Sequence, residues 1–420
     1  MRRTIEYEVD LAVIGGGLAG LCAAVQAARL GCKVLLMQDR PMPGGNASSE
    51  VRMWPRGCPE RDLQETGLIE ELFCENMWRN PTRNYSLWDS VMYGMARNEP
   101  NLTLLLNTTC IDGERELIGH LPLPPQFGRG ETAHLPGVGP GADLLVAAAT
   151  NPTPIPQYRL VSVTGWQLTT YSYHRVKARY FADCSGDSVL AELSGALYRV
   201  GREAADEFNE NLAPPQTDRK TMGNSIILNA RETDRNSTFE PPAWAEKYPD
   251  ESRFNHREHD MREPTLNYWW IELGGDRDTL TDAEDLRDEL LATTLGVWDH
   301  IKNHGADSGA SVACAVSGTA ATVGKFVENA PNQGAFAVDP LAIHNADKFE
   351  LDWLGFLPGK RESRRYVGPL TLTQSDLQEP RCFPDEISHG GWPLDDHHPG
   401  GFTHPGNPNH NGPVRAPYGI

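Results

Sequence analysis

A cluster of histidines and aspartates near the end of the sequence contains side chains that can transfer protons. Asp395, Asp396, His397 and His398 are consecutive, and His404 follows. A histidine near neutral pH can remove a proton from an alcohol or a carbon acid, and an aspartate can fix its tautomer. Neighbouring side chains point apart on an extended chain, so at most one of the two adjacent histidines faces a substrate. We therefore predict His397 or His398 as a catalytic base, with Asp395 as its partner.

Two other interpretations of these histidines remain open. Imidazole and carboxylate groups together suit zinc, iron or nickel. The spacing contains no His-x-x-x-His pair and no other metal signature, so we predict no metal site. The flanking glycines and prolines in GGWPLDDHHPGGFTHP are also typical of a surface loop without chemistry.

Basic side chains are concentrated between Lys360 and Arg365, in the sequence KRESRR. Arginines in such a group can hold a carboxylate or another anionic oxygen through paired hydrogen bonds. An arginine network paired with local Asp and Glu is the alternative. We predict that Arg361 and Arg364 belong to the catalytic site and bind an anionic group.

A glycine-rich stretch near the start could position a nucleotide. The apolar run Leu11–Ile14 predicts a buried parallel strand, and Gly15, Gly17 and Gly20 follow it in the G-x-G-x-x-G pattern. The first glycine permits a tight turn, the second lets the backbone approach a pyrophosphate, and the third lets helix and strand pack closely. The phosphates would lie at the N-terminus of a helix that begins at Leu18.

The elements that follow complete one strand–helix–strand unit. The segment Leu18–Leu30 is rich in Ala and Leu and predicts a helix, and Gly31 stands where a C-terminal cap belongs. Lys33–Met37 predicts a second buried strand. This context indicates a dinucleotide site rather than a structural turn.

The residues after the second strand depart from the dinucleotide pattern. An acid normally binds the ribose there, but this chain has Gln38, with Asp39 beside it. Gln38 could still form a hydrogen bond with a ribose hydroxyl. Arg40 leaves a 2′-phosphate, and hence NADP, open.

A second glycine turn follows at Gly44, Gly45 and Asn46, and Arg52 comes shortly after it. Backbone amides of this turn can approach an anion and Arg52 can pair with one, although a surface loop would have the same composition. Together, IGGGLAG and QDRPMPGGNASSEVRMW resemble the FAD-dependent oxidoreductases of the glutathione-reductase-like superfamily. The resemblance is specifically to the group whose flavin domain is similar to the flavin-bearing subunit of heterodisulfide reductase. It implies FAD as cofactor, with this turn beside the diphosphate and the flavin ring.

The sequence ADCSGDSVLAELSGA resembles the second flavin-domain signature of the same family. It implies that Ser185, Gly186 and Asp187 lie near the first glycine turn, whereas a strand, turn and helix without cofactor contact would explain the same residues. The resemblance also implies that the RESRR block lies on the substrate side of the flavin. The predicted FAD contacts are Gly15, Gly17, Leu18, Ala19, Gly20, Gln38, Asp39, Arg40, Gly44, Gly45, Asn46, Arg52, Ser185, Gly186 and Asp187.

The predicted fold class is α/β: a Rossmann-like FAD-binding parallel sheet with a β-meander and an added α+β substrate domain. We predict an FAD-binding domain over 1–200, a substrate domain over 201–372, and a segment over 373–420 that returns to the flavin site. A Pro- and Gly-rich insertion is expected at about 112–158, and a second insertion, rich in small residues, at about 305–348. The remaining predicted helices are 65–78, 86–99 and 189–195, with a capping box at Thr281 and Glu284 before an apolar helical stripe. The remaining predicted strands are 102–107, three short ones from 160 to 182, 226–230 and 268–273.

Composition limits the partners of the protein. The net charge of −19 opposes binding to nucleic acid or to an anionic membrane surface. No apolar run is long enough to span a membrane and no signal peptide is visible, so we expect a cytoplasmic protein. The eight cysteines are scattered without a Cys-x-x-Cys pair, so iron–sulfur ligation within this chain is not expected.

The predicted function is hydride transfer between FAD and a small organic substrate, either a sugar-like alcohol or a carbon acid. Two alternatives remain: an electron-relay flavoprotein subunit that works with an iron–sulfur partner, and an NAD(P)-binding protein without flavin catalysis. The resemblance further implies a late strand, turn and helix that close the FAD site in relatives. Because the sequence ends at PVRAPYGI, we expect a truncated product with low FAD affinity.

Overall fold

The computed structural model describes residues 3–53, 55, 66–121, 132–133, 144–145, 155–253, 271–304, 346–368, 370–378, 386–390, 397–404 and 416–419. Its largest element is a six-stranded sheet with the strand order β3-β2-β1-β8-β7-β4. The strands are β1 (Thr4–Ile14), β2 (Val34–Met37), β3 (Leu102–Leu105), β4 (Thr108–Leu121), β7 (Ile155–Gln167) and β8 (Ser172–Asp183). Parallel pairs join β3 to β2, β2 to β1 and β1 to β8. The predicted Rossmann-like parallel sheet is confirmed, with its third strand beside the second.

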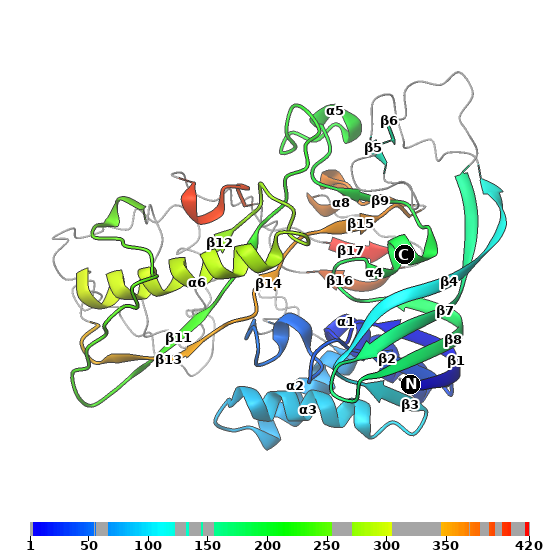
Figure 1. Ribbon diagram of the computed structural model, residues 1–420, viewed down its shortest axis with the longest axis horizontal. Helices are drawn as coiled ribbons and strands as arrows, with labels where there is room; N and C mark the ends of the chain where they lie inside the picture. The colour runs from blue at the N-terminus through cyan, green and yellow to red at the C-terminus, as the bar shows by residue number, and fades with distance from the viewer. Residues whose placement is uncertain are drawn as a thin grey trace.

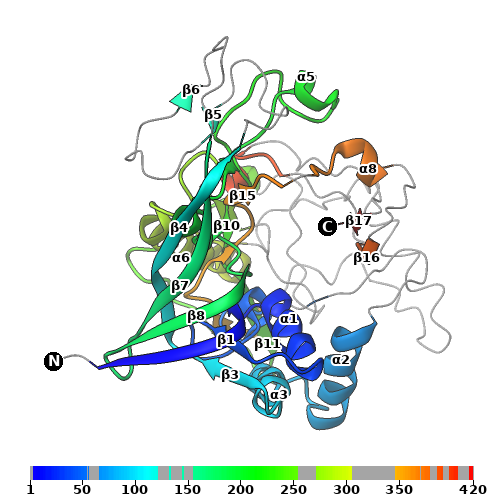
Figure 2. The ribbon, with the colours of Figure 1, turned by 90° about the vertical axis from the view of Figure 1, so that its right-hand side faces the viewer.

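Three helices cover one face of this sheet: α1 (Leu18–Arg29), α2 (Gly67–Arg79) and α3 (Tyr85–Arg97). Figure 2 shows them gathered on one side of the strands. Their apolar side chains pack on Val13, Val34 and Leu36, and the indole of Trp88 is completely buried among them. These helices match the sequence predictions within a few residues, because their apolar stripes have the helical period.

The antiparallel strands β4, β7 and β8 form the predicted meander, which curves along one end of the molecule (Figure 1). Val163 of β7 and Val176 of β8 share a core with Ala12, Ile14 and Met37, on the side of the sheet away from α1. The short helix α4 (Val189–Ser194) packs on the same core and was predicted correctly.

Two sequence predictions in this region were wrong. Residues 112–121 and 155–158 were assigned to an insertion but belong to β4 and β7. Two long strands joined at 168–171 replace the three short strands. The pairing of β4 with β7 shifts register at three places, between Cys110 and Asp112, between Glu114 and Arg115, and between Leu117 and Gly119. Such bulges break the alternation of apolar and polar residues from which a strand is recognised.

A second group of elements packs around α6 (Ala283–Asp299), at the other end of the molecule from the meander (Figure 1). One small sheet has the order β12 (Glu272–Leu273), β10 (Asn224–Ser225) and β14 (Gly359–Lys360), and a second pairs β11 (Leu228–Glu232) with β13 (Phe349–Leu354). Apolar side chains of β11, β12, β13 and α6 form one core around the buried Trp298. The apolar stripe of the predicted helix is therefore core, as expected.

Other predictions for this part were inaccurate. Of the predicted strand 226–230, only 228–230 lie in a strand, β11, and only 271–273 of the predicted strand 268–273 are described. No side chain caps α6 at its N-cap Asp282, so the predicted capping box is wrong. Instead Asp278 accepts hydrogen bonds from the amides of Leu280 and Thr281, while Glu284 pairs with Arg287. The predicted insertion at 305–348 lies outside the described residues, apart from 346–348.

Short elements join the two groups. Strand β9 (Tyr198–Val200) pairs with β15 (Arg364–Tyr366), so the chain returns from the α6 region to the end of the meander. The remaining elements are β5 (Thr132–Ala133), β6 (Leu144–Leu145), α5 (Ala205–Phe208), α8 (Gln374–Gln378), β16 (Glu386–Gly390), β17 (Ala416–Gly419) and the single turns η1 (Gly45–Ala47), η2 (Glu251–Arg253), η3 (His300–His304) and η5 (Gly401–Thr403). The predicted domain boundaries stay predictions.

Candidate active site and cofactor site

The first glycine turn brings backbone segments into close contact at the carboxyl ends of β1 and β8. Gly15 has a φ of +99°, and a Cβ added to it would lie 2.3 Å from the carbonyl oxygen of Cys184. A Cβ on Gly20 would lie 1.9 Å from the carbonyl oxygen of Gly15. No larger residue fits either position without moving backbone atoms, which explains the spacing of these glycines.

The N-terminus of α1 is open toward this turn. Its N-cap is Gly17, and no side chain forms a cap hydrogen bond with the first-turn amides, which belong to Leu18, Ala19 and Gly20. The second turn lies alongside, because the amide of Gly44 donates to the carbonyl of Gly16 at 2.7 Å and Gly44 forms a parallel bridge with Gly17. Free amides and the positive end of the helix dipole suit a phosphate.

Gln38 follows β2 directly, at the position expected for ribose binding, but its amide group is engaged within the protein. Its Oε1 accepts a hydrogen bond from the amide of Gly16 at 2.5 Å, and its Nε2 donates to the carbonyl of Met42 at 3.4 Å. The residue is 3% exposed. Asp39 is exposed beside it, and Arg40 extends toward Glu50, with 3.9 Å between Arg40 Nε and Glu50 Oε2.

The loop after the second turn contacts the strands β11, β13 and β14 of the group around α6. Asn46 donates from Nδ2 to the carbonyl of Lys360 at 2.9 Å. The guanidinium of Arg52 lies 4.3 Å from the ring centre of Tyr85 and 4.0 Å from that of Trp353, and it donates to Oδ1 of Asn229 at 3.1 Å.

Arg52 was predicted to contact the cofactor. Burial lowers the pKa of its guanidinium, and its aromatic neighbours come from α3 and β13. The side chain therefore joins helix α3 to the group of elements around α6.

The turn after β8 is held by its own side chains. Asp183 accepts hydrogen bonds from the hydroxyl of Ser185 at 2.6 Å and from the amide of Leu190 at 2.7 Å. Asp187 forms an ion pair of 2.6 Å with Lys360 through Oδ2, while its Oδ1 is buried without a hydrogen-bond partner among the described residues. Gly186 has a φ of +80° and open space around it. These contacts fix the shape of the turn, and the predicted FAD contacts of Ser185, Gly186 and Asp187 stay predictions.

A buried charged cluster lies on the small sheet β12-β10-β14. Nδ1 of His397 is 2.8 Å from Oε2 of Glu272, and Nε2 of His397 is 3.4 Å from Nη2 of Arg361. Arg361 Nε lies 3.5 Å from the same carboxylate oxygen. The side chains of Glu272, Arg361 and His397 are only 1%, 8% and 14% exposed.

The cluster projects from the face of this sheet that α6 does not cover. Ile271 and Leu273 flank Glu272 and belong to the α6 core. Because side chains alternate along a strand, Glu272 points to the opposite face. A Cβ on Gly223 would lie 2.2 Å from the carbonyl oxygen of Leu273. Because Gly223 has no side chain, its backbone amide comes close enough to β12 to donate to Glu272 Oε1 at 2.8 Å.

The sequence prediction did not include Glu272, which was treated as part of a strand in the run IEL. A single carboxylate inside an apolar strand was the available indication, because a buried acid needs a partner. Asp395, predicted as the partner of the histidine, lies outside the described residues.

The other predicted catalytic residues are placed differently. Arg364 donates from Nε to the carbonyl of Asp187 at 3.0 Å and pairs with Glu192 at 2.9 Å, so it holds the turn after β8. The exposed ring of His398 stacks on His404, with 3.6 Å between ring centres. Within the described ranges, no three His, Cys, Asp or Glu side chains form a candidate metal site.

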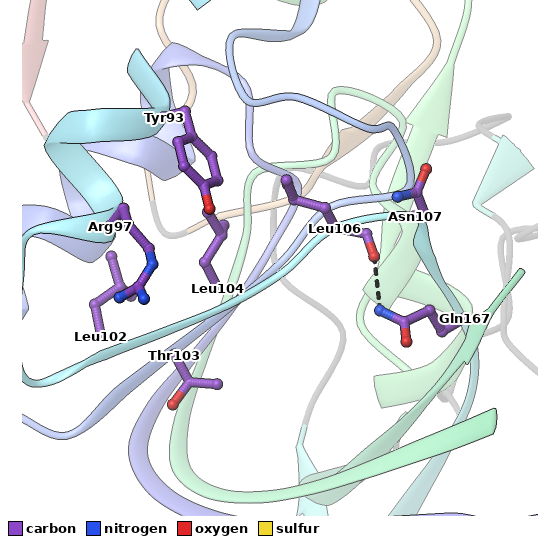
Figure 3. Close-up of a pocket in the computed structure, with 8 residues that line it drawn as sticks. All are labelled: Tyr93, Arg97, Leu102, Thr103, Leu104, Leu106, Asn107 and Gln167. Atoms are coloured by element: carbon purple, nitrogen blue, oxygen red, sulfur yellow. Dashed lines mark hydrogen bonds between the residues drawn. The ribbon is translucent and has the colours of Figure 1, made fainter. Parts of the chain in front are cut away.

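A separate cavity of about 400 Å³ lies beside the edge strand β3 (Figure 3). Tyr93 and Arg97 of α3 line one side, and Gln167 lines the other, where its Nε2 donates to the carbonyl of Leu106 at 2.9 Å. None of the predicted site residues lines this cavity.

Comparison with known proteins identifies the family. The family model of FAD dependent oxidoreductases matches residues 10–121 and 140–420. The chain belongs to this family. FAD is therefore its cofactor, and the protein is a flavin-dependent oxidoreductase, as predicted.

Individual relatives of this oxidoreductase share shorter or weaker similarity. The chain is 31% identical over 110 residues to an opine oxidase subunit of Agrobacterium tumefaciens (strain Ach5), which covers 23% of this chain and 20% of that protein. It matches the myxobacterial FAD-dependent chondrochloren halogenase CndH at 14% identity over 56% of this chain and 45% of that one, with a TM-score of 0.28. It matches L-proline dehydrogenase from P. horikoshii at 16% identity over 51% of this chain and 31% of that one, with a TM-score of 0.22. The chain spans less than half the length of each.

The described residues of the oxidoreductase fit FAD on two counts. The glycine contacts and the uncapped α1 N-terminus suit the pyrophosphate, and buried atoms of Arg40, Glu50 and Asp187 around the two turns have no hydrogen-bond partner among the described residues.

Among the residues that the structure describes, no helix is both long and apolar enough to cross a membrane.

Proposed function

We propose that this oxidoreductase transfers hydride between FAD and a small organic substrate, a sugar-like alcohol or a carbon acid, at the cluster of Glu272, Arg361 and His397. One observation supports the assignment above the others. In a buried site, one ring nitrogen of His397 contacts the negative Glu272 and the other contacts the positive Arg361. Bound FAD would accept the hydride from the substrate carbon.

The two partners fix the tautomer of His397. An arginine can only donate, so Nε2 of His397 accepts from Nη2 of Arg361, and Nδ1 then carries the proton and donates to Glu272. When the substrate displaces the 3.4 Å contact with Arg361 Nη2, the lone pair of Nε2 takes the proton of the substrate hydroxyl or acidic carbon. Two electrons and one proton leave the substrate as hydride, and the second proton goes to His397. Glu272 stabilises the imidazolium formed in this step.

Arg361 has a second role in the proposal. Its guanidinium is held beside Glu272 and next to the ring nitrogen that takes the proton. A substrate carboxylate or developing oxyanion that pairs with Arg361 therefore brings its reacting group to Nε2. Arg364 acts on the framework in this proposal, through the turn at Asp187.

The test is anaerobic flavin reduction by pools of sugars and hydroxy acids in the FAD-loaded protein. We expect His397→Gln to slow reduction by about 10²–10⁴-fold, because general-base catalysis is worth that much, with an unchanged spectrum of bound FAD. Added imidazole should restore part of the rate. His304→Gln, at the end of η3 with a side chain that is 42% exposed, is the matched control. A normal rate in His397→Gln, or a larger loss in His398→Gln, would remove His397 from the reaction.

A second candidate is an electron-relay component of a larger complex. It is supported by the match over 110 residues to a protein named as one subunit of an opine oxidase. In that case the chain works with a partner that holds iron–sulfur centres, and its substrate is an amino-acid derivative of the opine type. Reduction by opines that occurs only after a co-expressed partner is added would favour this candidate over the first.

The finer parts of the assignment complete the proposal. We infer that the flavin domain is of the glutathione-reductase-like type and similar to the flavin-bearing subunit of heterodisulfide reductase. The parallel strands followed by a meander and the second turn at Asp183–Asp187 support this inference. A small-molecule substrate and no nucleic-acid or membrane partner are proposed on the net charge of −19. The cytoplasmic location stays a proposal.

A further inference from the structure

Two buried charged atoms near the first glycine turn lack hydrogen bonds. Nη1 of Arg40 and Oε2 of Glu50 are inaccessible to solvent and have no hydrogen-bond partner among the described residues. The nearest approach between the two side chains is 3.9 Å, which is an ion pair but too long for a hydrogen bond. Burial raises the pKa of Glu50, and Arg40 opposes the rise. The two side chains are otherwise 23% and 27% exposed, so a ligand can reach the pair and supply the missing hydrogen bonds.

These two side chains lie where the ribose of a dinucleotide is expected. Arg40 is the third residue after β2, two positions beyond Gln38. Its carbonyl accepts a hydrogen bond from the amide of Asn107, which follows β3. Glu50 comes from the loop after the Gly44 turn, which is hydrogen-bonded to the first glycine turn. Gln38, the residue at the usual ribose position, has both ends of its amide engaged within the protein.

We propose that Arg40 and Glu50, rather than Gln38, bind the vicinal diol of the adenosine ribose of FAD. A diol fits this pair because its hydroxyls donate to the carboxylate and its oxygens accept from the guanidinium. The loop at Glu50 thereby replaces the acid that other dinucleotide sites place at the end of the second strand. The proposal is independent of the substrate chemistry above, because it concerns only how the adenosine end of the cofactor is held.

The same pair discriminates against a 2′-phosphate. Glu50 lies beside Arg40, and the exposed Asp39 adds a second negative charge nearby. A phosphate dianion that approached Arg40 would be repelled by both carboxylates. The possibility of NADP that Arg40 leaves open in the sequence is therefore disfavoured by the tertiary position of Glu50.

The test measures FAD binding to the apoprotein by quenching of flavin fluorescence, with FAD and its 2′-deoxyadenosine analogue as probes. We expect the unmodified protein to bind the analogue about tenfold more weakly, the lower limit for a hydrogen bond to a charged group. In Glu50→Ala the affinity for FAD falls by about tenfold or more and the two probes bind within twofold of each other. Glu50→Gln gives an intermediate result.

Three controls keep the result interpretable. FMN has no adenosine, so its affinity should be the same in Glu50→Ala as in the unmodified protein, which shows that the variant is folded. Glu75→Gln removes an exposed carboxylate of α2 and should leave both probes unaffected. Gln38→Glu should retain the tenfold preference for FAD. If Glu50→Ala keeps that preference, or Gln38→Glu abolishes it, the proposal is overturned.

Discussion

Replacement of Gly15 by alanine measures how much the fold depends on the contact between the first glycine turn and the turn after β8. Gly15 has a φ of +99°, and the added Cβ would meet the carbonyl oxygen of Cys184 at 2.3 Å and the Cα of Ser185 at 2.5 Å. Gly31 has nearly the same backbone, with a φ of +94°, but nothing lies within 4 Å of its added Cβ. Gly31→Ala is therefore a matched control that contains the backbone strain without the collision.

The two effects can be separated in magnitude. A left-handed backbone costs a residue with a Cβ about 1–2 kcal/mol, and this applies to both variants. The collision at Gly15 involves backbone atoms that no rotamer change can move, and overpacking of this kind costs about 1–3 kcal/mol more. We expect the free energy of unfolding to fall by about 1–2 kcal/mol in Gly31→Ala and by about 2–5 kcal/mol in Gly15→Ala.

The assay is urea unfolding followed by tryptophan fluorescence, with FAD binding measured on the same samples. Gly31→Ala should bind FAD as the unmodified protein does, because it lies at the far end of α1. Gly15→Ala should bind FAD weakly or not at all, because the turn that approaches the pyrophosphate has moved. Equal losses of stability in the two variants, with FAD binding intact in both, would refute the close contact as the reason for glycine at this position.

Three further results are expected. Burial lowers the pKa of His174 below its usual 6.5. The unfolded chain therefore takes up this proton at a higher pH than the folded protein, and stability should fall as the pH drops below 6.5. His174→Gln should flatten a plot of melting temperature against pH. Lys360→Met leaves the partly buried carboxylate of Asp187 uncompensated and should cost about 1–3 kcal/mol in urea unfolding; an unchanged midpoint would contradict this. Arg52→Lys loses the stacking on Trp353 and should cost about 0.5–2 kcal/mol, measured likewise, and no change would mean that the stacking is not stabilising.

The flavin-binding half could be predicted well because its information is local. The strand, the glycines and the helix that begins at Leu18 follow one another within one unit, and each residue type reports its own backbone requirement. Gly31 is an example, since its positive φ is needed only to end α1. The meander was predicted less well, because three register shifts in β4 hide its alternation.

The candidate catalytic cluster depends on contacts that sequence patterns do not report. His397 and Glu272 are 125 positions apart, and Arg361 is 36 positions from His397. Arg361 and His397 were recognisable by type and Glu272 was not, and only the packing of 397–404 onto β12 selects His397 over its neighbour. The same holds for Arg40 and Glu50, which no periodicity joins.

The sequence by itself determined the nucleotide-binding unit, its glycine turn and the acidic net charge, since these follow from local conformational preferences and composition. The tertiary structure decided which acid stands beside His397, that Arg52 is held between two aromatic rings, and that Gln38 is engaged with the first turn. The physical reason is that hydrogen bonding and burial of a charged side chain depend on groups brought from distant parts of the chain, which only the folded structure places together.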